Sequence, residues 1–331
     1  MVSIGRARSK CVSEFVVWVF NMFDFFKNGI YPIGVDISDD GIRIAQLKEV
    51  RSAYVMVGGA SANLPENITP GSPDWQKWSL QTIKDLTACG GFTGRDVIVS
   101  IPPSDVYIDY IKAQKTSGRN ANEAILARAK QKLPADLNDP LVKSIPADED
   151  NLLVVATERI KIDRHLAIYE NAGLRVRSIG IWPQALVNSY VRFFGRRHSD
   201  LETVVMLIDV GILRTNVVIC RHNNLLFARS IPSGVRLLTD QDALNQLILE
   251  VSGCRQQFGS IYKKVRIERL LFISGQAVDR NICVAIAKQI QIAAQIGDCL
   301  SAVQTSNHHN SGMEKRNCQF SWATAFGLSL A

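Results

Sequence analysis

Apolar and polar positions along the chain fall into two successive series of predicted elements. The first series predicts strands at 32–37, 42–48, 54–62, 97–101, 106–111, 152–156 and 176–181. Apolar residues at helical spacing in the same half predict helices at 75–89, 120–133, 164–172 and 183–194. The second series predicts strands at 204–209, 215–221, 225–232 and 269–274, and helices at 237–258, 279–291 and 322–330.

Each series runs through three strands, a helix, a strand and a helix, which predicts a doubled mixed α/β plan with a cleft between two lobes. We expect lobe one at 31–195 and lobe two at 201–331, joined by a short polar linker. Residues from about 105 to 150 interrupt the return to the first sheet and are expected to form an inserted small subdomain. A basic and aromatic N-terminal extension, residues 1–30, precedes lobe one.

The N-terminal extension is basic over residues 1–10 and strongly apolar over 15–26. It imitates a signal peptide, but no small-residue cleavage site follows. Its apolar part is shorter than the roughly 20 residues that span a bilayer. We therefore expect an interfacial segment that contacts a membrane surface. Two other hypotheses are a helix packed on the domain surface, and translation that begins at Met22.

Composition narrows the classes of function. The 331 residues are 47% hydrophobic and 21% charged, with a net charge of +7 from 38 basic and 31 acidic residues. This charge suits an anionic membrane surface or an acidic partner, whereas no basic stripe interleaved with aromatic residues indicates nucleic-acid binding. The seven cysteines are scattered and form no C-x-x-C pair, so we expect incidental thiols in a reducing compartment. The five histidines have no metal-ligand spacing, which argues against a metal site built from them.

Two short segments carry the candidate chemistry. In each, an apolar strand leads to an aspartate, Asp36 or Asp209, and then to a tight turn and a second strand. Backbone N–H groups of such turns converge into an anion-binding nest, and glycine permits close approach of a phosphate. Asp36 and Asp209 are the candidate metal ligands, since carboxylates at strand ends can hold hydrated Mg²⁺. Alternatively, each aspartate merely begins a hairpin turn.

The chain resembles the PilM family of type IV pilus assembly proteins, which are actin-like and related to FtsA. The segments that carry the resemblance are 32–47, 154–186, 204–238 and 270–277. The resemblance implies a two-lobed actin-like ATPase (ribonuclease-H-like) α/β fold, with an inserted small subdomain in lobe one.

Carried over by resemblance, three turns would bind ATP with Mg²⁺. The implied nucleotide-binding residues are Asp36, Ser38, Asp39, Asp40 and Gly41 in the first turn, Asp209, Gly211 and Thr215 in the second, and Ser274, Gly275 and Gln276 in the third. All three turns depart from the family pattern, most clearly where Ser38 replaces a glycine and two carboxylates follow it. We therefore expect a degenerate nucleotide cleft, and we assign no catalytic residue.

The resemblance also implies a partner and a location. It indicates a cytoplasmic adaptor, peripheral to the inner membrane, that binds the cytoplasmic tail of a PilN-like inner-membrane protein in a pilus or type II secretion-like platform. Homo-oligomers are compatible with this hypothesis. The expected peptide-groove residues on lobe one, for which ordinary core packing is the alternative, are Ile101, Val106, Ile108, Ile111, Ile125 and Leu133. Two competing hypotheses are an ATP-binding enzyme of the sugar-kinase/actin superfamily and an FtsA-like membrane-tethered filament protein.

Overall fold

A computed structural model describes residues 29–112, 120–305 and 320–331 of the chain. The predicted membrane-surface segment, except residues 29 and 30, and the hypothesis of a start at Met22 lie outside this described part. Within it, no helix combines the length and the apolar character needed to cross a membrane.

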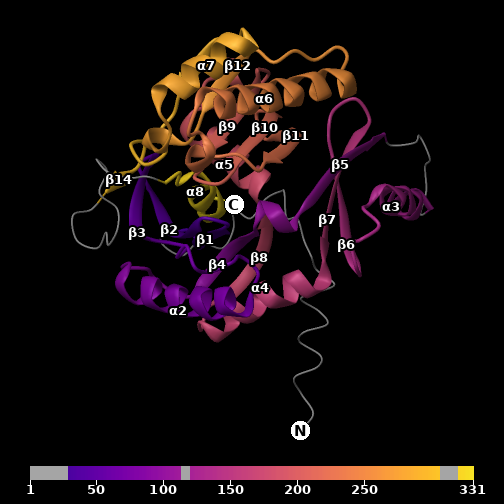
Figure 1. Ribbon diagram of the computed structural model, residues 1–331. Helices are drawn as coiled ribbons and strands as arrows, with labels where there is room; N and C mark the ends of the chain where they lie inside the picture. The colour runs from indigo at the N-terminus through magenta and orange to yellow at the C-terminus, as the bar shows by residue number, and fades with distance from the viewer. Residues whose placement is uncertain (1–28, 113–119, 306–319) are drawn as a thin grey trace.

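The first sheet forms the centre of lobe one. Its strands, in spatial order, are β14 (Gln304–Thr305), β3 (Ala53–Asn63), β2 (Gly41–Val50), β1 (Ile33–Ser38), β4 (Asp96–Ile101) and β8 (Arg175–Ile181). β1, β2 and β3 form an antiparallel meander, and β4 and β8 continue the sheet in parallel. Helices α2 (Pro73–Cys89) and α4 (Arg159–Asn171) cover one face of this sheet (Figure 1).

The second sheet repeats the plan of the first. Its strands, in spatial order, are β11 (Asn224–Ile231), β10 (Thr215–Arg221), β9 (Val204–Val210), β12 (Arg269–Phe272) and β13 (Ala294–Ile296). Again three strands form an antiparallel meander and the next strand pairs in parallel with the first of them. Helices α6 (Gln241–Ile261) and α7 (Arg280–Ile290) lie on the outer side of this sheet (Figure 1). The predicted doubling of an α/β unit is thus present.

The helix predicted from residue 237 begins at Gln241 instead. The Asp240 side chain accepts a hydrogen bond from the Ala243 N–H at 2.9 Å and caps the helix there. The residues just before it, Val235–Leu237, form a short 3₁₀ turn, η4. This difference matters for the site because η4 lies against the second turn of the cleft.

The inserted subdomain is a three-stranded antiparallel sheet with one helix. Its members are β5 (Tyr107–Lys112), α3 (Asn120–Lys132), β6 (Pro140–Pro146) and β7 (Asn151–Glu158). Strand β6 was not predicted, because only one of its side chains is fully buried and prolines stand at both of its ends. The subdomain also contacts lobe two, where the Tyr110 ring stacks on Phe227 with centroids 5.4 Å apart.

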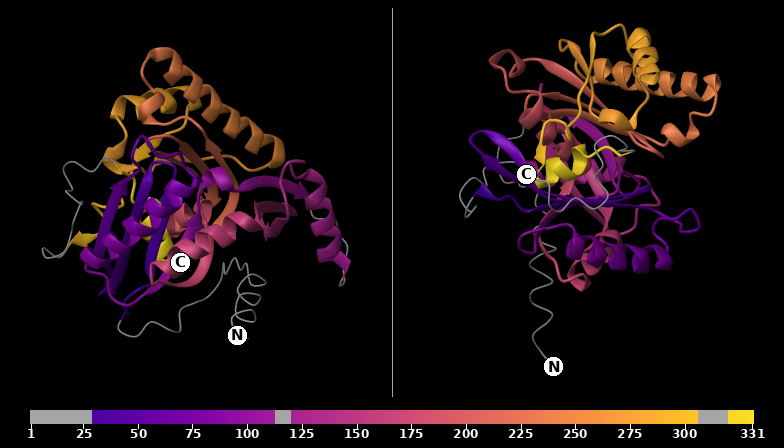
Figure 2. Two further views of the ribbon diagram at one scale, coloured as in Figure 1. Left: turned by 60° about the horizontal axis from the view of Figure 1, so that its bottom comes forward. Right: turned by 90° about the vertical axis from the view of Figure 1, so that its left-hand side faces the viewer.

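The C-terminal residues correct the expected extent of lobe two. β14 pairs with β3 of the first sheet, and helix α8 (Ala323–Ser329) packs against β1 and against α5 (Trp182–Phe193). Every residue of α8 is buried, so this helix needs apolar surface on all sides. It finds that surface between the lobes (Figure 2), where α5 and the first sheet enclose it.

Candidate functional site

The cleft between the lobes is built by two hairpin turns. The first joins β1 to β2, where Ser38 pairs with Gly41 and leaves Asp39 and Asp40 as the two turn residues. Gly41 has φ +154°, and a Cβ atom there would lie 2.2 Å from the Ala62 carbonyl oxygen. The conformation of the first turn and its packing on Ala62 therefore require glycine at position 41.

Arg43 holds the acidic side chains of the first turn. Its Nη2 lies 2.9 Å from Asp40 Oδ1, its Nη1 donates to Ser38 Oγ at 2.7 Å, and the same Nη1 lies 3.8 Å from Asp36 Oδ2. The Ser38 hydroxyl in turn donates to Asp40 Oδ1 at 2.6 Å. Sequence reasoning missed Arg43, although an arginine inside the apolar strand 42–47 signals a buried ionic partner.

The buried carboxylates of the cleft have shifted pKa values. The pKa of Asp36 is raised to about 6, chiefly by burial; the attraction of Arg43 opposes this rise, and the nearby charges of Asp40 and Asp209 add to it. Burial also raises the pKa of Asp209. For Asp40, burial opposes ionisation, but Arg43 and the Ser38 hydrogen bond together hold its pKa below the ordinary value. Asp40 is therefore the carboxylate of this group that is most firmly ionised.

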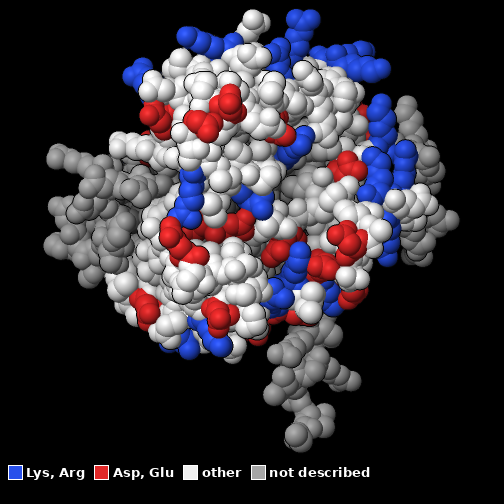
Figure 3. Space-filling view, in the orientation of Figure 1, with Lys and Arg blue, Asp and Glu red and all other residues white. Residues whose placement is uncertain are grey.

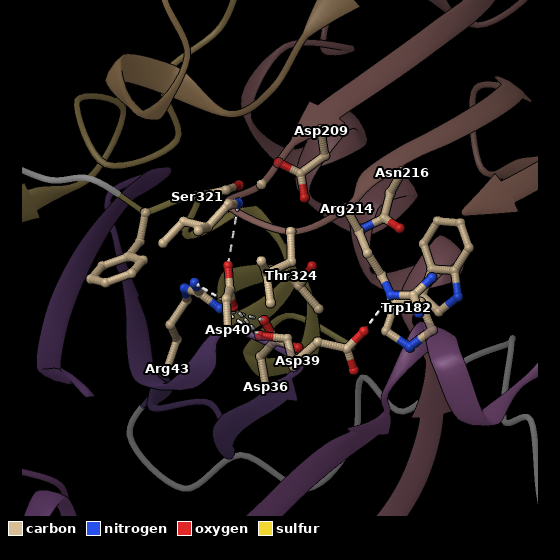
Figure 4. A pocket seen from close by; sticks show the side chains of 16 residues that line it. Asp36, Asp39, Asp40, Arg43, Trp182, Asp209, Arg214, Asn216, Ser321 and Thr324 are labelled. Carbon is tan, nitrogen blue, oxygen red and sulfur yellow. Dashed lines mark hydrogen bonds and ion pairs between the residues drawn. The ribbon is translucent and has the colours of Figure 1, made fainter. Parts of the chain in front are cut away.

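The second turn, between β9 and β10, contacts the first turn across the cleft. The Ile212 N–H donates to Asp40 Oδ2 at 3.4 Å, and Arg214 forms an ion pair with Asp39. Asp39 also accepts a hydrogen bond from Ser104 Oγ at 2.9 Å. The two carboxylates of the first turn are thus bonded to groups of lobe two (Figure 4).

The far side of the second turn is packed against the segment that follows β11. The N–H groups of Val235 and Arg236 donate to the carbonyls of Gly211 and Ile212, each at 2.9 Å. A Cβ atom on Gly234 would lie 2.5 Å from the Gly211 carbonyl oxygen. The second turn is therefore clamped between this segment and Asp40.

Two of the predicted nucleotide-binding positions, Thr215 and Ser274, make hydrogen bonds within the protein. Thr215 is fully buried and its hydroxyl donates to the Ser233 carbonyl at 2.7 Å. Ser274 Oγ accepts a hydrogen bond from the Val210 N–H at 2.6 Å, which ties the third turn to the end of β9. Gly275 has φ +63° and packs on Asp298, whereas Gln276 is exposed. Ser274 and Gln276 line a separate cavity of about 10 Å³.

The cavity between the first two turns has a volume of about 50 Å³. Six of the predicted residues line it, namely Asp36, Ser38, Asp39, Asp40, Asp209 and Gly211. The ten other lining residues were not among those predicted from the sequence: Arg43, Pro103, Trp182, Ile212, Leu213, Arg214, Asn216, Phe320, Ser321 and Thr324. In the view of Figure 3, acidic side chains lie across the middle of the molecule, with basic side chains immediately above them. Pockets that enclose small-molecule ligands usually measure about 300–1,000 Å³.

Asp36 and Asp209, the predicted metal ligands, line this same cavity. Asp209 Oδ1 is buried and has no hydrogen-bond partner within the described residues. No group of three or more histidine, cysteine, aspartate or glutamate side chains suited to a metal ion is found among those residues. Magnesium binding by this pair stays a prediction, since two carboxylates could hold an ion that keeps several waters.

A second hollow, about 460 Å³ in volume, adjoins the cleft. Ser38, Asp39, Leu213 and Arg214 line both hollows, so the paired turns form the wall between them. The remaining lining residues are Pro70, Gly71, Trp75, Pro102, Ser104, Asp105, Pro232 and Leu237. Both lobes thus contribute to a hollow with the volume of a ligand pocket.

The six predicted peptide-groove residues do not line one trough. Ile101 is buried against Ile162, and Ile111 is buried with Val154 and Ala129, where Ile125 also packs. The other three lie elsewhere: Val106 and Ile108 are half-buried against the large central core, and half-buried Leu133 follows the end of α3. Ile101 and Ile111 are too deeply buried to contact a peptide, so they belong to the core, which is the alternative interpretation given above.

Comparison with known proteins adds a family and a fold. The family model for the type IV pilus assembly protein PilM matches residues 34–244. The solved structure of a PilM–PilN type IV pilus biogenesis complex aligns with a TM-score of 0.72 at 16% identity, covering 91% of this chain and 98% of that one. This likeness confirms the actin-like fold expected from the sequence.

Two further solved structures align less well. One is the ethanolamine utilization protein EutJ from Carboxydothermus hydrogenoformans, with a TM-score of 0.48, 12% identity and 99% coverage of both chains. The other is the cytoplasmic domain of EpsL, an inner membrane component of the type II secretion system of Vibrio cholerae, with a TM-score of 0.48, 10% identity and coverage of 85% and 90%. No curated protein sequence matches the chain.

Proposed function

The chain belongs to the PilM family of type IV pilus assembly proteins, and from this premise we propose that it is an actin-like adaptor of a pilus assembly platform. Its partner is the cytoplasmic tail of a PilN-like inner-membrane protein, which holds it at the cytoplasmic face of that membrane. The 460 Å³ hollow between the lobes is the observation that carries this proposal.

The chemistry of the hollow suits a short extended peptide. Leu213, Pro232 and Leu237 supply apolar surface, while Asp105 and Arg214 supply charge. Peptide grooves combine an apolar trough with a polar rim in this way. The hollow is also next to the region in which the sequence placed the groove, since η2 (Pro103–Asp105) connects Ile101 to Val106.

The same geometry favours an adaptor over the two competing hypotheses. A kinase-like enzyme needs a pocket for a nucleotide and an acceptor, and the 50 Å³ cleft cavity is several-fold below the usual size of such pockets. Helix α8 cannot serve as the free amphipathic tether of an FtsA-like filament protein, because it is buried between α5 and the first sheet. Membrane contact through residues 1–30 stays a prediction.

The proposal is tested by calorimetric titration of the purified chain with a synthetic peptide of the cytoplasmic tail of the PilN-like protein from the same genome. Leu237 lines the hollow and is 50% exposed, so Leu237→Glu should fold normally but weaken binding by at least about tenfold. Leu249, which is 60% exposed on α6 and is not part of the hollow, provides the matched control Leu249→Glu. Equal affinities of the two variants would place the tail elsewhere, and no binding by the unaltered chain would reject the partner.

A further inference from the structure

The two turns of the cleft are bonded directly to each other, although in an actin-like fold a nucleotide's phosphates are expected between them. Asp40 accepts a hydrogen bond from the Ile212 N–H, and Asp39 is ion-paired with Arg214. These contacts join residues more than 170 positions apart in the chain. Each one pairs a carboxylate of lobe one with a donor group of lobe two.

We propose that Asp39 and Asp40 act as built-in substitutes for nucleotide phosphates, latching the two lobes together so that the cleft closes without ATP. A carboxylate carries negative charge and accepts hydrogen bonds from backbone N–H groups and guanidinium groups, as a phosphate does. This inference goes beyond the proposed adaptor function, because it holds whether or not a PilN-like partner binds.

We call the two contacts between the lobes, Asp39 with Arg214 and Asp40 with Ile212, the latch. Residues of lobe one hold its two carboxylates in position. Arg43 and Ser38 both bond to Asp40 Oδ1, which leaves its Oδ2 directed toward Ile212. Ser104 donates to Asp39 Oδ1, which leaves its Oδ2 for Arg214. Each carboxylate therefore uses one oxygen within its own lobe and the other across the cleft. Side chains that are already oriented lose little conformational freedom when such contacts form.

The donor side of the latch is equally constrained. Gly211 and Ile212 are fixed from behind by the backbone N–H groups of Val235 and Arg236. The Gly211 N–H is itself used, donating to the Arg214 carbonyl at 2.8 Å. The second turn therefore presents the Ile212 N–H to the cleft, and Asp40 occupies it.

The residues present do not fit a nucleotide triphosphate. An incoming phosphate would have to separate Asp39 from Arg214 and Asp40 from Ile212. It would then meet four carboxylates and only two guanidinium groups among the cavity's charged side chains. One of these carboxylates, Asp209, has its buried Oδ1 without a partner among the described residues, and the equally unpaired Asn216 Oδ1 would face the phosphate too. Like charges and unpaired acceptors disfavour an anion.

The first test is calorimetric titration of the full chain with ATP and Mg²⁺. We expect no saturable heat from the unaltered chain. Micromolar binding would overturn the proposal, because it would show that phosphate groups displace the latch. Tail-peptide binding is measured separately, so failure of one proposal does not count against the other.

The second test measures hydrogen exchange of the Ile212 amide. Asp39→Arg and Arg214→Asp should each speed this exchange by at least about tenfold, because each breaks the ion pair between the lobes. The double charge swap, with both substitutions, should restore slow exchange. The control Arg229→Asp breaks an ion pair with Glu250 inside lobe two and should leave the Ile212 amide unchanged.

Unchanged exchange in both single variants, or no recovery in the double swap, would overturn the latch. If circular dichroism shows that a reversed charge unfolds the chain, Arg214→Gln replaces it with the same expectation. The neutral glutamine removes the charge but keeps a long polar side chain.

Discussion

Asp36 is a carboxylate buried in the cleft, and its pKa of about 6 makes folding depend on pH. Between its ordinary value of 3.8 and about 6, the folded protein keeps a proton that the unfolded chain has released. The contribution of Asp36 to stability is therefore complete below that ordinary value and is lost as the pH rises to about 6. Asp209, whose pKa is also raised by burial, acts in the same direction.

Asp36→Asn removes this titration while keeping the shape of the side chain. We expect the variant to be more stable than the unaltered chain at pH 7, by about 3 kcal/mol at most. Urea unfolding between pH 4 and pH 7 should show a smaller fall in stability with rising pH. Asp74→Asn on α2 is the control; it removes only an exposed ion pair with Lys77 and should change stability by less than about 1 kcal/mol. An unchanged pH slope in Asp36→Asn would mean that another group titrates.

Helix α8 shows how an element near the C-terminus comes to lie between the lobes. Glycines allow its close approach on two sides, at Gly34 in β1 and at Gly327 in α8 itself. A Cβ atom on Gly34 would lie 2.1 Å from the Ala325 carbonyl oxygen, and one on Gly327 would lie 1.8 Å from that of Ala185. Ser329 adds polar contacts, donating to the Pro32 carbonyl at 2.8 Å and accepting from the Leu47 N–H at 3.2 Å.

Gly327→Ala should therefore push α8 away from α5. We expect a loss of roughly 1–3 kcal/mol in the free energy of unfolding, since overpacking a tight contact costs about this much. Gly253→Ala in α6 is the matched control, because a Cβ atom there meets nothing within 4 Å. That control should stabilise by about 0.5–1 kcal/mol through helix propensity. Chemical denaturation of both variants measures these changes in the free energy of unfolding. Equal changes would contradict the argument that α8 is tightly packed at Gly327.

Across the whole molecule, the inserted subdomain connects lobe one to the outer edge of lobe two. β11 is an edge strand of the second sheet, and exposed edges tend to pair with other chains. The Tyr110 hydroxyl accepts a hydrogen bond from the Ala228 N–H of β11 at 2.5 Å. Asp148 forms an ion pair with Arg221 and accepts from Asn224 Nδ2 at 2.7 Å. The subdomain thus covers part of this edge.

Tyr110→Phe keeps the ring stacked on Phe227 but leaves the buried Ala228 N–H without its acceptor. We expect a loss of about 1–3 kcal/mol in stability and faster hydrogen exchange at the Ala228 amide. Tyr107→Phe removes a hydroxyl that bonds to the Lys132 carbonyl in an exposed setting, so its effect should be much smaller. Similar losses from both variants would show that the hydroxyl of Tyr110 does not secure the subdomain.

The sequence by itself determined the elements that lie in continuous apolar patterns and the doubled order in which they occur. It also placed Asp36 and Asp209 near the ends of corresponding strands, β1 and β9, because a strand and its turn are local features of the chain. The departures from the family pattern at 38–40 and 212–214 were visible in the same way. Local order thus pointed to Asp36, Ser38, Asp39 and Asp40, which line the cleft cavity, but it missed Arg43, which lines the cavity as well.

Only the tertiary structure decided what those residues bind. The partners of Asp39 and Asp40 in lobe two lie more than 170 residues away, and no spacing in the chain specifies them. Strand β14 and helix α8 join lobe one although they follow lobe two in sequence. β14 pairs with the edge of the first sheet, and α8 finds there the apolar surface that its buried residues need. Thr215 resembles a phosphate ligand in the sequence, yet its hydroxyl is taken by Ser233. Such pairings follow from long-range packing, which selects among partners that local patterns leave equivalent.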